Sequence, residues 1–212
     1  MNSPTDEATP FERLLTPWRQ VATKVDTFVD HVEDAYRKEM RCAAGCAACC
    51  QQDLTVLLPE AIALIAAIEG LPPDIRNTLA RAGARPSAPP CAFLDDEGRC
   101  RIYPLRPIVC RSHGIPIRQD QDVAVCSLNF QGADADTYPP DATLNASIIT
   151  AALTVADALL RQILDHLEPQ PRIPLRLLAR HGRGALTPEA QRALALTLDA
   201  PPSAPLDDQS PA

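Results

Sequence analysis

Eight cysteines, four of them within nine residues, constrain this chain more than any other feature of its sequence. The first four follow the pattern Cys42-x3-Cys46-x2-Cys49-Cys50, and the others are Cys91, Cys100, Cys110 and Cys126. Such crowding does not suit hydrophobic packing, because Ala or Val would fill the same space without a reactive thiol. We therefore expect these cysteines to serve as metal ligands or as redox groups.

Two segments of the sequence indicate where the protein resides: the N-terminus and the most apolar long stretch. Residues 1–10 are polar and interrupted by proline, which is not the pattern of a signal peptide. Residues 143–167 carry Asp157, Arg161 and Asp165, which makes them too polar to cross a bilayer. We expect a cytoplasmic protein with no membrane partner, in which thiols stay reduced and disulfides do not form.

Composition excludes several function classes. The 212 residues suffice for one ordinary domain or two small ones, with 46% hydrophobic and 22% charged residues. A net charge of -7 and only 4% aromatic residues argue against nucleic acid as a partner. The chain contains no phosphate-binding glycine loop, Gly-x-Ser-x-Gly elbow or His-Glu-x-x-His motif, which removes the common nucleotide-binding, hydrolase and zinc-protease classes.

Hydrophobic periodicity predicts a mostly α fold, a helical core with a small cysteine-rich β-hairpin and irregular metal-binding loops. The expected helices cover residues 17–40, 59–68, 73–82, 143–167, 175–180 and 187–198. We expect a short strand within 53–58, a hairpin over 91–103, and irregular chain over 104–142 with one helical turn near 107–111. The apolar stripes of the two long helices are expected to face the core.

The predicted organisation has four parts. Residues 1–10 form a disordered leader, 11–170 a cysteine-cluster metal-binding domain, 171–198 the C-terminal helices and 199–212 a disordered tail.

The spacing of the first four cysteines bears on how many ions they hold. An unbroken helix would put all four thiols on one face, yet Cys42 and Cys50 would lie about 12 Å apart along the axis. Sulfurs on one zinc ion are only about 3.8 Å apart. Either Gly45 breaks the helix into a wrapping loop, or the thiols serve a larger cluster or two ions, which the adjacent pair Cys49-Cys50 favours.

The four later cysteines would complete such sites. Cys91 and Cys100 flank the expected hairpin and should approach each other, while Cys110 and Cys126 come from the loops that follow. Eight thiolates suit two zinc sites of four, or one iron–sulfur cluster with several thiols left over, and spacing alone does not choose.

The pattern of residues 40–130 resembles the YkgJ-type cysteine-cluster family. The resemblance rests on Cys42-x3-Cys46-x2-Cys49-Cys50, on Cys91-x-Phe93-Leu94, on Cys100-x-Ile102-Tyr103-x2-Arg106-Pro107-x2-Cys110-Arg111 and on Cys126. It implies a zinc- or iron-chelating domain. Flagellin lysine methylase has a similar cluster, which by analogy implies a reaction linked to S-adenosylmethionine.

Several residues near the cysteines have two interpretations. His113 is either a ligand or proton carrier, or a solvated loop histidine. Arg106 and Arg111 either offset thiolate charge and bind an anionic substrate, or pair with acids among residues 95–97 and brace the loop. Tyr103 is expected to pack and to brace the site through its hydroxyl.

The first cysteines also match the spacing of enzymes that generate radicals from S-adenosylmethionine. Those enzymes place the motif after a first barrel strand, whereas a long helix precedes it here. The sequence therefore predicts a metal-binding protein with zinc, iron or an iron–sulfur cluster, its ligands drawn from the eight cysteines. The alternatives are an iron–sulfur redox enzyme or a protein methyltransferase, and a metal-delivery or interaction module with no turnover.

Overall fold

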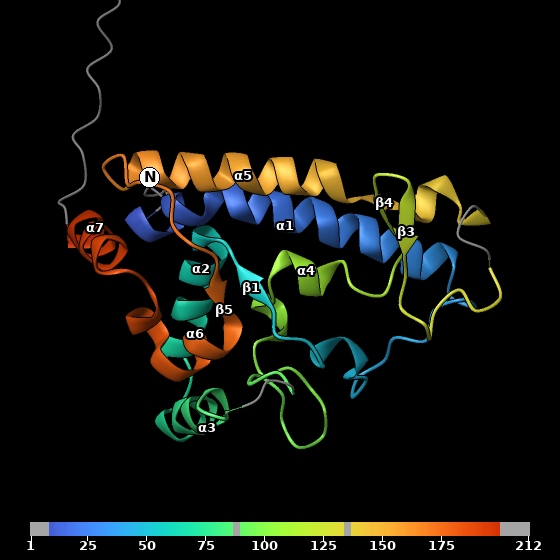
Figure 1. Cartoon of the computed structure of the whole chain (residues 1–212), viewed down its shortest axis with the longest axis horizontal. Coiled ribbons are helices and arrows are strands. Elements are labelled where there is room, and N and C mark those ends of the chain that lie inside the picture. Colours follow the sequence, from blue (N-terminus) through green and yellow to red (C-terminus); the bar gives the residue numbers. More distant parts are fainter. Residues whose placement is uncertain (1–8, 87–89, 134–136, 200–212) are drawn as a thin grey trace, which may run out of the picture.

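The computed structural model describes residues 9–86, 90–133 and 137–199, and in this part of the chain the fold is mostly α, as predicted. Short strands and cysteine-bearing loops connect the helices (Figure 1). The α-helices of the described residues are α1 (Pro10–Ala35), α2 (Leu58–Glu69), α3 (Pro73–Gly83), α4 (Ile108–Arg111), α5 (Ala146–Ile163), α6 (Leu175–His181) and α7 (Pro188–Asp199).

Helix α1 begins inside the segment predicted to be a disordered leader. Thr9 is its N-cap, and a capping box with Glu12 satisfies backbone N–H groups that the first turn leaves unpaired. Its apolar face buries Val25, Val29 and Val32, which confirms the predicted stripe. The helix ends at Ala35, earlier than the sequence predicted, and residues 1–8 of the leader lie outside the described residues.

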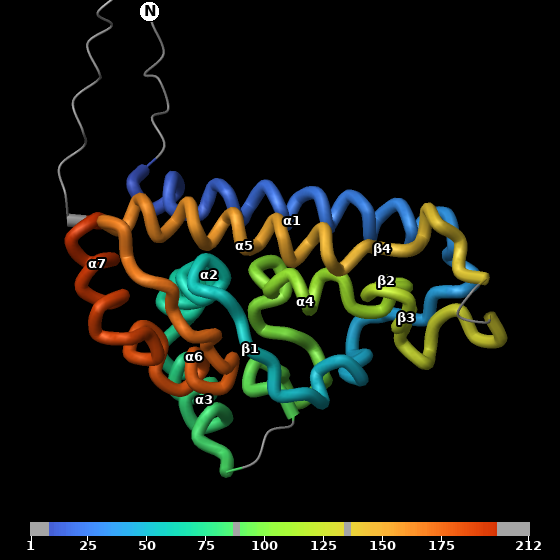
Figure 2. Tube along the Cα trace, turned by 45° about the horizontal axis from the view of Figure 1, so that its top comes forward, coloured from blue at the N-terminus to red at the C-terminus, as the bar shows by residue number. Residues whose placement is uncertain are grey.

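Two long helices lie side by side and form one layer of the molecule. Helices α1 and α5 run along each other in both views, and the remaining elements pack on one side of the pair (Figures 1 and 2). Helices α2, α6 and α7 occupy one end of this second layer, and α4 lies against the middle of α1. The core between the layers contains Trp18, Leu64 and Leu160, each at most 2% exposed.

The strands are short and tie distant segments together. Strand β1 (Thr55–Val56) pairs antiparallel with β5 (Ile173–Pro174), which joins the cysteine segment to the C-terminal helices. Strand β2 (Ile117–Gln119) pairs antiparallel with β3 (Asp122–Ala124) and parallel with β4 (Leu144–Asn145). This small sheet corrects the prediction of irregular chain over 104–142, although the predicted helical turn is present as α4.

The hairpin predicted over residues 91–103 is smaller than expected. It consists of one antiparallel bridge between Leu94 and Cys100 around a turn that contains Gly98. Asp95 stabilises the turn by accepting the backbone N–H of Arg99 and pairing with its guanidinium. Backbone hydrogen bonds from Asp95 to Arg99 and from Arg101 to Phe93 join the two sides of the loop, and the Asp95 side chain reinforces its turn.

Helix α5 differs from its prediction in length and in orientation. Asn145 caps its N-terminus by accepting the N–H groups of Ser147 and Ile148, so the helix is shorter than 143–167. The stripe predicted to be core is wrong: Ile148 is 66% exposed and Val155 58%. Instead, Ala156 and Leu160 face the core, because α5 packs on α1, α2 and β2 along a different side of the helix.

The C-terminal helices follow their predictions closely. Helix α6 covers the segment expected at 175–180, and Thr187 accepts the N–H of Ala190 at the start of α7. Residues 200–212 of the predicted tail lie outside the described residues. Helices α3 and α6 cross closely at Gly83, where a Cβ would lie 2.4 Å from the carbonyl oxygen of Arg176.

Candidate metal centre

The segment that carries the first four cysteines is a loop, not a helix. Gly45 has a φ of +88°, a left-handed conformation that breaks any helix continuing from α1. A 3-10 turn, η1 (Ala48–Cys50), follows and holds the adjacent pair Cys49 and Cys50. The four thiols are therefore not on one face of a continuous helix, and the number of ions they serve is left open by this break alone.

Close backbone contact brings the later cysteine loop onto this one. Gly98 has a φ of +74°, and a Cβ there would lie 2.8 Å from the carbonyl oxygen of Gly45. The N–H of Cys91 donates to the carbonyl oxygen of Cys50 at 2.9 Å. Two glycines and one backbone hydrogen bond thus place the loop of residues 91–100 against the loop of residues 41–50.

Five thiols from three segments, η1, the loop of residues 91–100 and α4, influence one another electrostatically, and we call them the five-thiol group. Its members influence one another's charge: Cys49 and Cys91 each raise the pKa of Cys100, and the same two raise the pKa of Cys50. Cys91 and Cys100 are neighbours, as the sequence predicted. The group comprises Cys49, Cys50, Cys91, Cys100 and Cys110.

The adjacent pair is the tightest part of the five-thiol group. The sulfurs of Cys49 and Cys50 are 3.8 Å apart. The hydrogen bond from Cys50 lowers the pKa of Cys49 to about 6, with help from the charges of His113 and Arg106. The same hydrogen bond, together with burial, raises the pKa of Cys50. One sulfur is therefore poised as a thiolate while its neighbour remains protonated.

Helix α4 presents Cys110 to this group, and a buried carboxylate anchors the helix. Glu60 is 3% exposed and accepts the N–H of Ile108 at 2.8 Å and that of Leu57 at 3.3 Å. Burial raises the pKa of Glu60, and burial with neighbouring thiolates raises the pKa of Cys110 to about 12. Sequence reasoning missed Glu60, which reads as an ordinary first-turn acid of α2.

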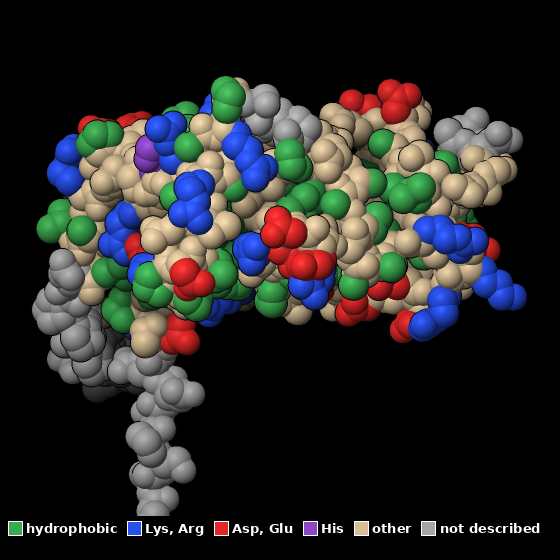
Figure 3. All heavy atoms as spheres, turned by 90° about the horizontal axis from the view of Figure 1, so that it is seen from below, with side chains coloured by type: hydrophobic (Ala, Val, Ile, Leu, Met, Phe, Trp, Pro, Cys, Tyr) green, Lys and Arg blue, Asp and Glu red, His purple; other side chains and the backbone are tan. Residues whose placement is uncertain are grey.

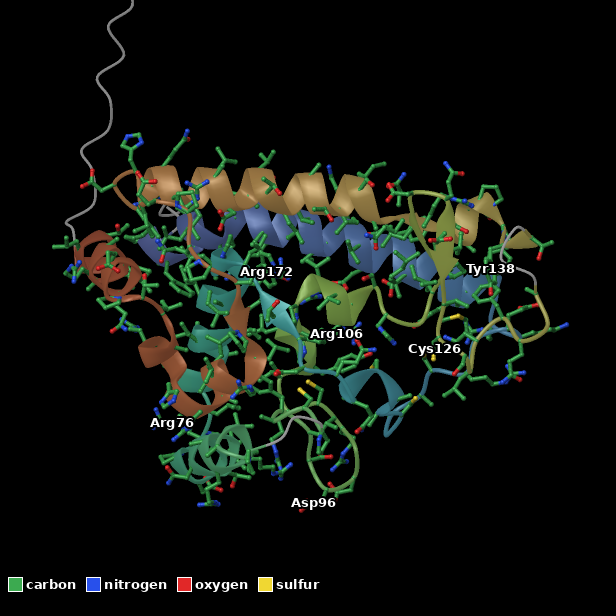
Figure 4. All side chains as sticks on the ribbon, viewed as in Figure 1. Arg76, Asp96, Arg106, Cys126, Tyr138 and Arg172 are labelled. Atoms are coloured by element: carbon green, nitrogen blue, oxygen red, sulfur yellow. The ribbon has the colours of Figure 1, made fainter. Side chains whose placement is uncertain are left out.

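The remaining cysteines form a second neighbourhood, the three-thiol group of Cys42, Cys46 and Cys126. Burial is the main cause of a raised pKa at Cys42, and the charges of Cys126 and Cys46 add to it. Figure 4 shows Cys126 near β3 and the end of α1, away from Asp96 on the loop of the five-thiol group. The eight thiols thus divide differently from the first four and last four of the sequence.

Asn129 holds the three-thiol group in place. It is 2% exposed, accepts the N–H of Arg41 at 2.7 Å, and donates to the carbonyl oxygen of Gly114 at 2.7 Å. Its amide also lies 3.3 Å from the sulfur of Cys42, to which it donates. Gly114 is required at its position, since a Cβ would lie 2.9 Å from that sulfur. No motif in the sequence marks Asn129.

The two arginines beside Cys110 have different environments. Arg111 is buried and braces the loop, donating to the carbonyl oxygens of Arg106 and Pro104 and pairing with Asp26 of α1. The predicted partners among residues 95–97 are therefore wrong, because Arg99 takes two of those acids. Arg106 remains near the thiols, where its charge lowers the pKa of Cys49 and of Cys100.

Tyr103 and His113 complete the surroundings. Tyr103 is 60% exposed, which corrects the expectation that it packs, and the guanidinium of Arg106 lies 3.8 Å from the centre of its ring. His113 is half-buried, and its charge helps lower the pKa of Cys49. Positive charge from Arg106 and His113 therefore faces one side of the five-thiol group.

The thiol donors suit a soft metal ion, although the loops keep most of the sulfur atoms too far apart to share one ion. All eight cysteines are free thiols, and seven are partly buried. Within the described residues, no three His, Cys, Asp or Glu side chains converge closely enough to hold an ion. The separation of Cys49 and Cys50 nevertheless equals the roughly 3.8 Å between two sulfurs on one zinc ion. Thiolates are the ligands that zinc and iron–sulfur clusters take, so the residues fit either.

Comparison with known proteins agrees with a zinc- or iron-binding role for these thiols. Residues 41–127 match the model of the family CxxCxxCC, described as "Putative zinc- or iron-chelating domain". No curated protein and no solved structure matches the chain. The matched segment begins just before Cys42 and ends just after Cys126, so it includes both thiol groups and confirms the resemblance to a cysteine-cluster family.

Proposed function

We propose that this protein binds metal at two separate thiolate centres. The match of residues 41–127 to a zinc- or iron-chelating domain supports metal binding. The main centre uses four or more members of the five-thiol group, and the three-thiol group forms a second centre. The observation that carries this proposal is the set of contacts around eight free thiols: the Cys49 and Cys50 sulfurs lie 3.8 Å apart with Cys91 bonded to the Cys50 backbone, while Asn129 holds Cys42 separately.

Electrostatics supports a cation at the five-thiol group. Without one, burial and mutual repulsion raise the pKa of Cys91, Cys100 and Cys110, so these thiols stay protonated at neutral pH. A bound cation would reverse that preference and stabilise the thiolates. Binding would release protons, and affinity would fall on acidification. Cys49, whose pKa is about 6, is the thiol that would engage the ion first.

The two groups differ in the number of donors they offer. Four thiolates close a tetrahedral site, and the five-thiol group exceeds that number. The three-thiol group supplies one donor fewer, which leaves a position for water or another small donor. Asn129 would support this second centre by its N–H contact with the Cys42 sulfur, an outer hydrogen bond of the kind that tunes metal–thiolate sites.

The surroundings favour a structural or metal-holding role over catalysis on a small molecule. The cavity beside Cys91 has a volume of about 20 Å³, room for one water molecule. A site for S-adenosylmethionine or a similar cofactor needs roughly 300 Å³ or more. A hollow of about 640 Å³ lies between Asp120 and the first turns of α5, and no cysteine lines it. Metal ligation by these loops would link η1, the turn at Gly98 and α4, which lack a strand ladder between them. Because thiolate centres of this kind need reduced cysteines, the cytoplasm is the proposed compartment.

Elemental analysis of protein purified anaerobically, without chelator, tests the proposal. We expect about one metal ion or cluster in each group, and fewer than eight thiols that react with a thiol reagent until a chelator is added. Zinc without colour would indicate closed structural sites, and iron with sulfide and visible absorption would indicate a cluster. A folded, metal-free protein with eight reactive thiols would refute metal binding.

A matched pair of variants tests the division into two centres. Cys100→Ser changes the five-thiol group, and Cys126→Ser changes the three-thiol group. Each variant should lose metal from its own group alone, seen as protection of the other group's thiols in peptide mapping by mass spectrometry. Loss of all metal in both variants would mean a single shared centre. Circular dichroism checks that each variant keeps the fold.

A further inference from the structure

Helix α5 carries an apolar stripe that the fold leaves uncovered. Exposed fractions along it are 66% for Ile148, 58% for Val155, 42% for Leu159 and 44% for Ile163. At 100° per residue these four positions fall within an arc of about 80°, and they extend over about 22 Å of helix. Large apolar side chains gathered in this way on a surface mark an interaction site more often than scattered ones do.

The stripe carries no charge. The charged residues of α5 are Asp157 and Arg161, which pair with each other at 2.9 Å and lie on the opposite side of the helix. In contrast, basic and acidic side chains are interspersed on the face turned away from α5 (Figure 3). A partner for the stripe must therefore be apolar and need not carry complementary charge.

The spacing of the stripe makes it complementary to itself. Its centre lies beside Val155, so an antiparallel copy of α5 would place Ile148 opposite Ile163 and Ala152 opposite Leu159. Val155 would then meet its own counterpart near the two-fold axis. Most soluble oligomers are two-fold dimers that bury the same patch of both subunits, and this arrangement meets that condition.

A lipid surface fits the same helix less well. By length and composition α5 could cross a membrane, and only 11% of it is buried. However, Ala156 and Leu160 pack into the protein core, and α5 contains no Trp, Tyr or Lys to anchor it at an interface. Its one Arg is already paired, and the chain's net charge of -7 opposes binding to anionic lipid.

From these observations we propose that the exposed stripe of α5 is the interface of a two-fold homodimer, in which two α5 helices pack antiparallel about Val155. One face of an 18-residue helix offers about 27 Å by 12 Å, which is less than the roughly 800 Å² per partner of a stable complex. The dimer is therefore weak and concentration-dependent. It lies apart from both thiol groups and does not depend on the proposed metal binding.

Sedimentation velocity under reducing conditions, from about 1 to 200 µM protein, tests this interface. Wild-type protein should shift from monomer toward dimer over that range, and Val155→Glu should weaken dimerisation at least tenfold by placing two like charges at the axis. The matched control is Leu196→Glu on α7, where an apolar side chain that is even more exposed than Val155, at 74%, lies outside the stripe. This control should dimerise like wild type.

Three results would overturn the proposal. The first is wild-type protein that stays monomeric at about 200 µM, the highest concentration tested. The second is a dimer that Val155→Glu does not weaken. The third is a monomer that floats with neutral phosphatidylcholine vesicles and loses that binding in Val155→Glu, which would assign the stripe to lipid. Unfolding midpoints of both variants should match wild type, since neither side chain is buried.

Discussion

Replacement of Arg111 by Met should detach the loop before α4 from helix α1 and destabilise the protein by about 3 kcal/mol. The Arg111 side chain is 8% exposed and its guanidinium has three kinds of partner. It donates to the carbonyl oxygen of Arg106 at 2.8 Å and to that of Pro104 at 2.6 Å, and it pairs with Asp26. The ring of Trp18 lies 5.7 Å from it.

The expected magnitude follows from these contacts. Hydrogen bonds from a charged group contribute about 1.5 to 3 kcal/mol each, and the two carbonyl oxygens would lose their partners. The ion pair adds about 1 kcal/mol or less, because Asp26 is 37% exposed and solvent screens it. Met would recover roughly 1 kcal/mol through its own burial, so that with each hydrogen bond taken at the lower end of its range the net loss is about 3 kcal/mol. In a chain of this size that lowers the melting temperature by roughly 6 to 12 °C.

Urea denaturation of the metal-free protein measures this loss, and Asp26→Asn is the matched control. Asn keeps an acceptor oxygen but removes the charge, so this variant should lose about 1 kcal/mol or less. The double variant should be no less stable than Arg111→Met alone, because the ion pair is already broken. If Arg111→Met lost under 1 kcal/mol, or Asp26→Asn lost as much, the carbonyl contacts would not be what braces the loop.

Three further predictions use other features of the structure. Gly83→Ala should lower the free energy of unfolding, measured in urea, by about 1 to 3 kcal/mol, because its Cβ would meet the backbone of α6. The control Gly70→Ala should be neutral or gain up to about 1 kcal/mol, since the atom nearest to its Cβ is 3.5 Å away. Glu60→Ala should lower the free energy of unfolding by about 2 to 4 kcal/mol, because it leaves two buried N–H groups unpaired. Glu60→Gln should lose less, since one acceptor oxygen remains, and equal losses in the two variants would refute that account. Alkylation by iodoacetamide, followed by mass spectrometry on metal-free protein, should show Cys49 reacting with a midpoint near pH 6 and Cys110 unreactive below pH 9, because their pKa values are about 6 and about 12. Since folding favours the Cys49 thiolate, its contribution to stability is present above the unfolded thiol's pKa near 8.5 and is lost as pH falls through 6.

Much of the secondary structure was predictable because local signals agree with the fold. Pro73, Thr187 and the periodic stripe of α1 mark helices that the structure contains. The start of α1 was missed because a capping box at Thr9 extends the helix into a polar, proline-containing segment. Strands β2 and β4 were missed because each is only two or three residues long, and β4 forms by pairing with β2, a distant segment of the chain.

The sequence predicted the candidate donors of the site and not how they are grouped. The number and spacing of the cysteines predicted thiolate ligation, with all eight as candidate ligands. Which thiols are neighbours depends on contacts such as the hydrogen bond from Cys91 to Cys50 and the approach of Gly98 to Gly45. Such long-range contacts leave no periodic pattern in the sequence. The same is true of Asn129, whose amide reaches Cys42 across 87 positions.

The sequence by itself determined which candidate soft ligands this protein carries and where most of its helices lie, because both depend on side-chain type and spacing. Only the tertiary structure decided which ligands share a neighbourhood and which apolar stripe is buried. Helix α5 shows the reason: its period predicts that one side is apolar, yet burial depends on what packs there. Helix α1 covers Ala156 and Leu160 and leaves Val155 exposed, a result of packing between helices more than a hundred residues apart in the sequence.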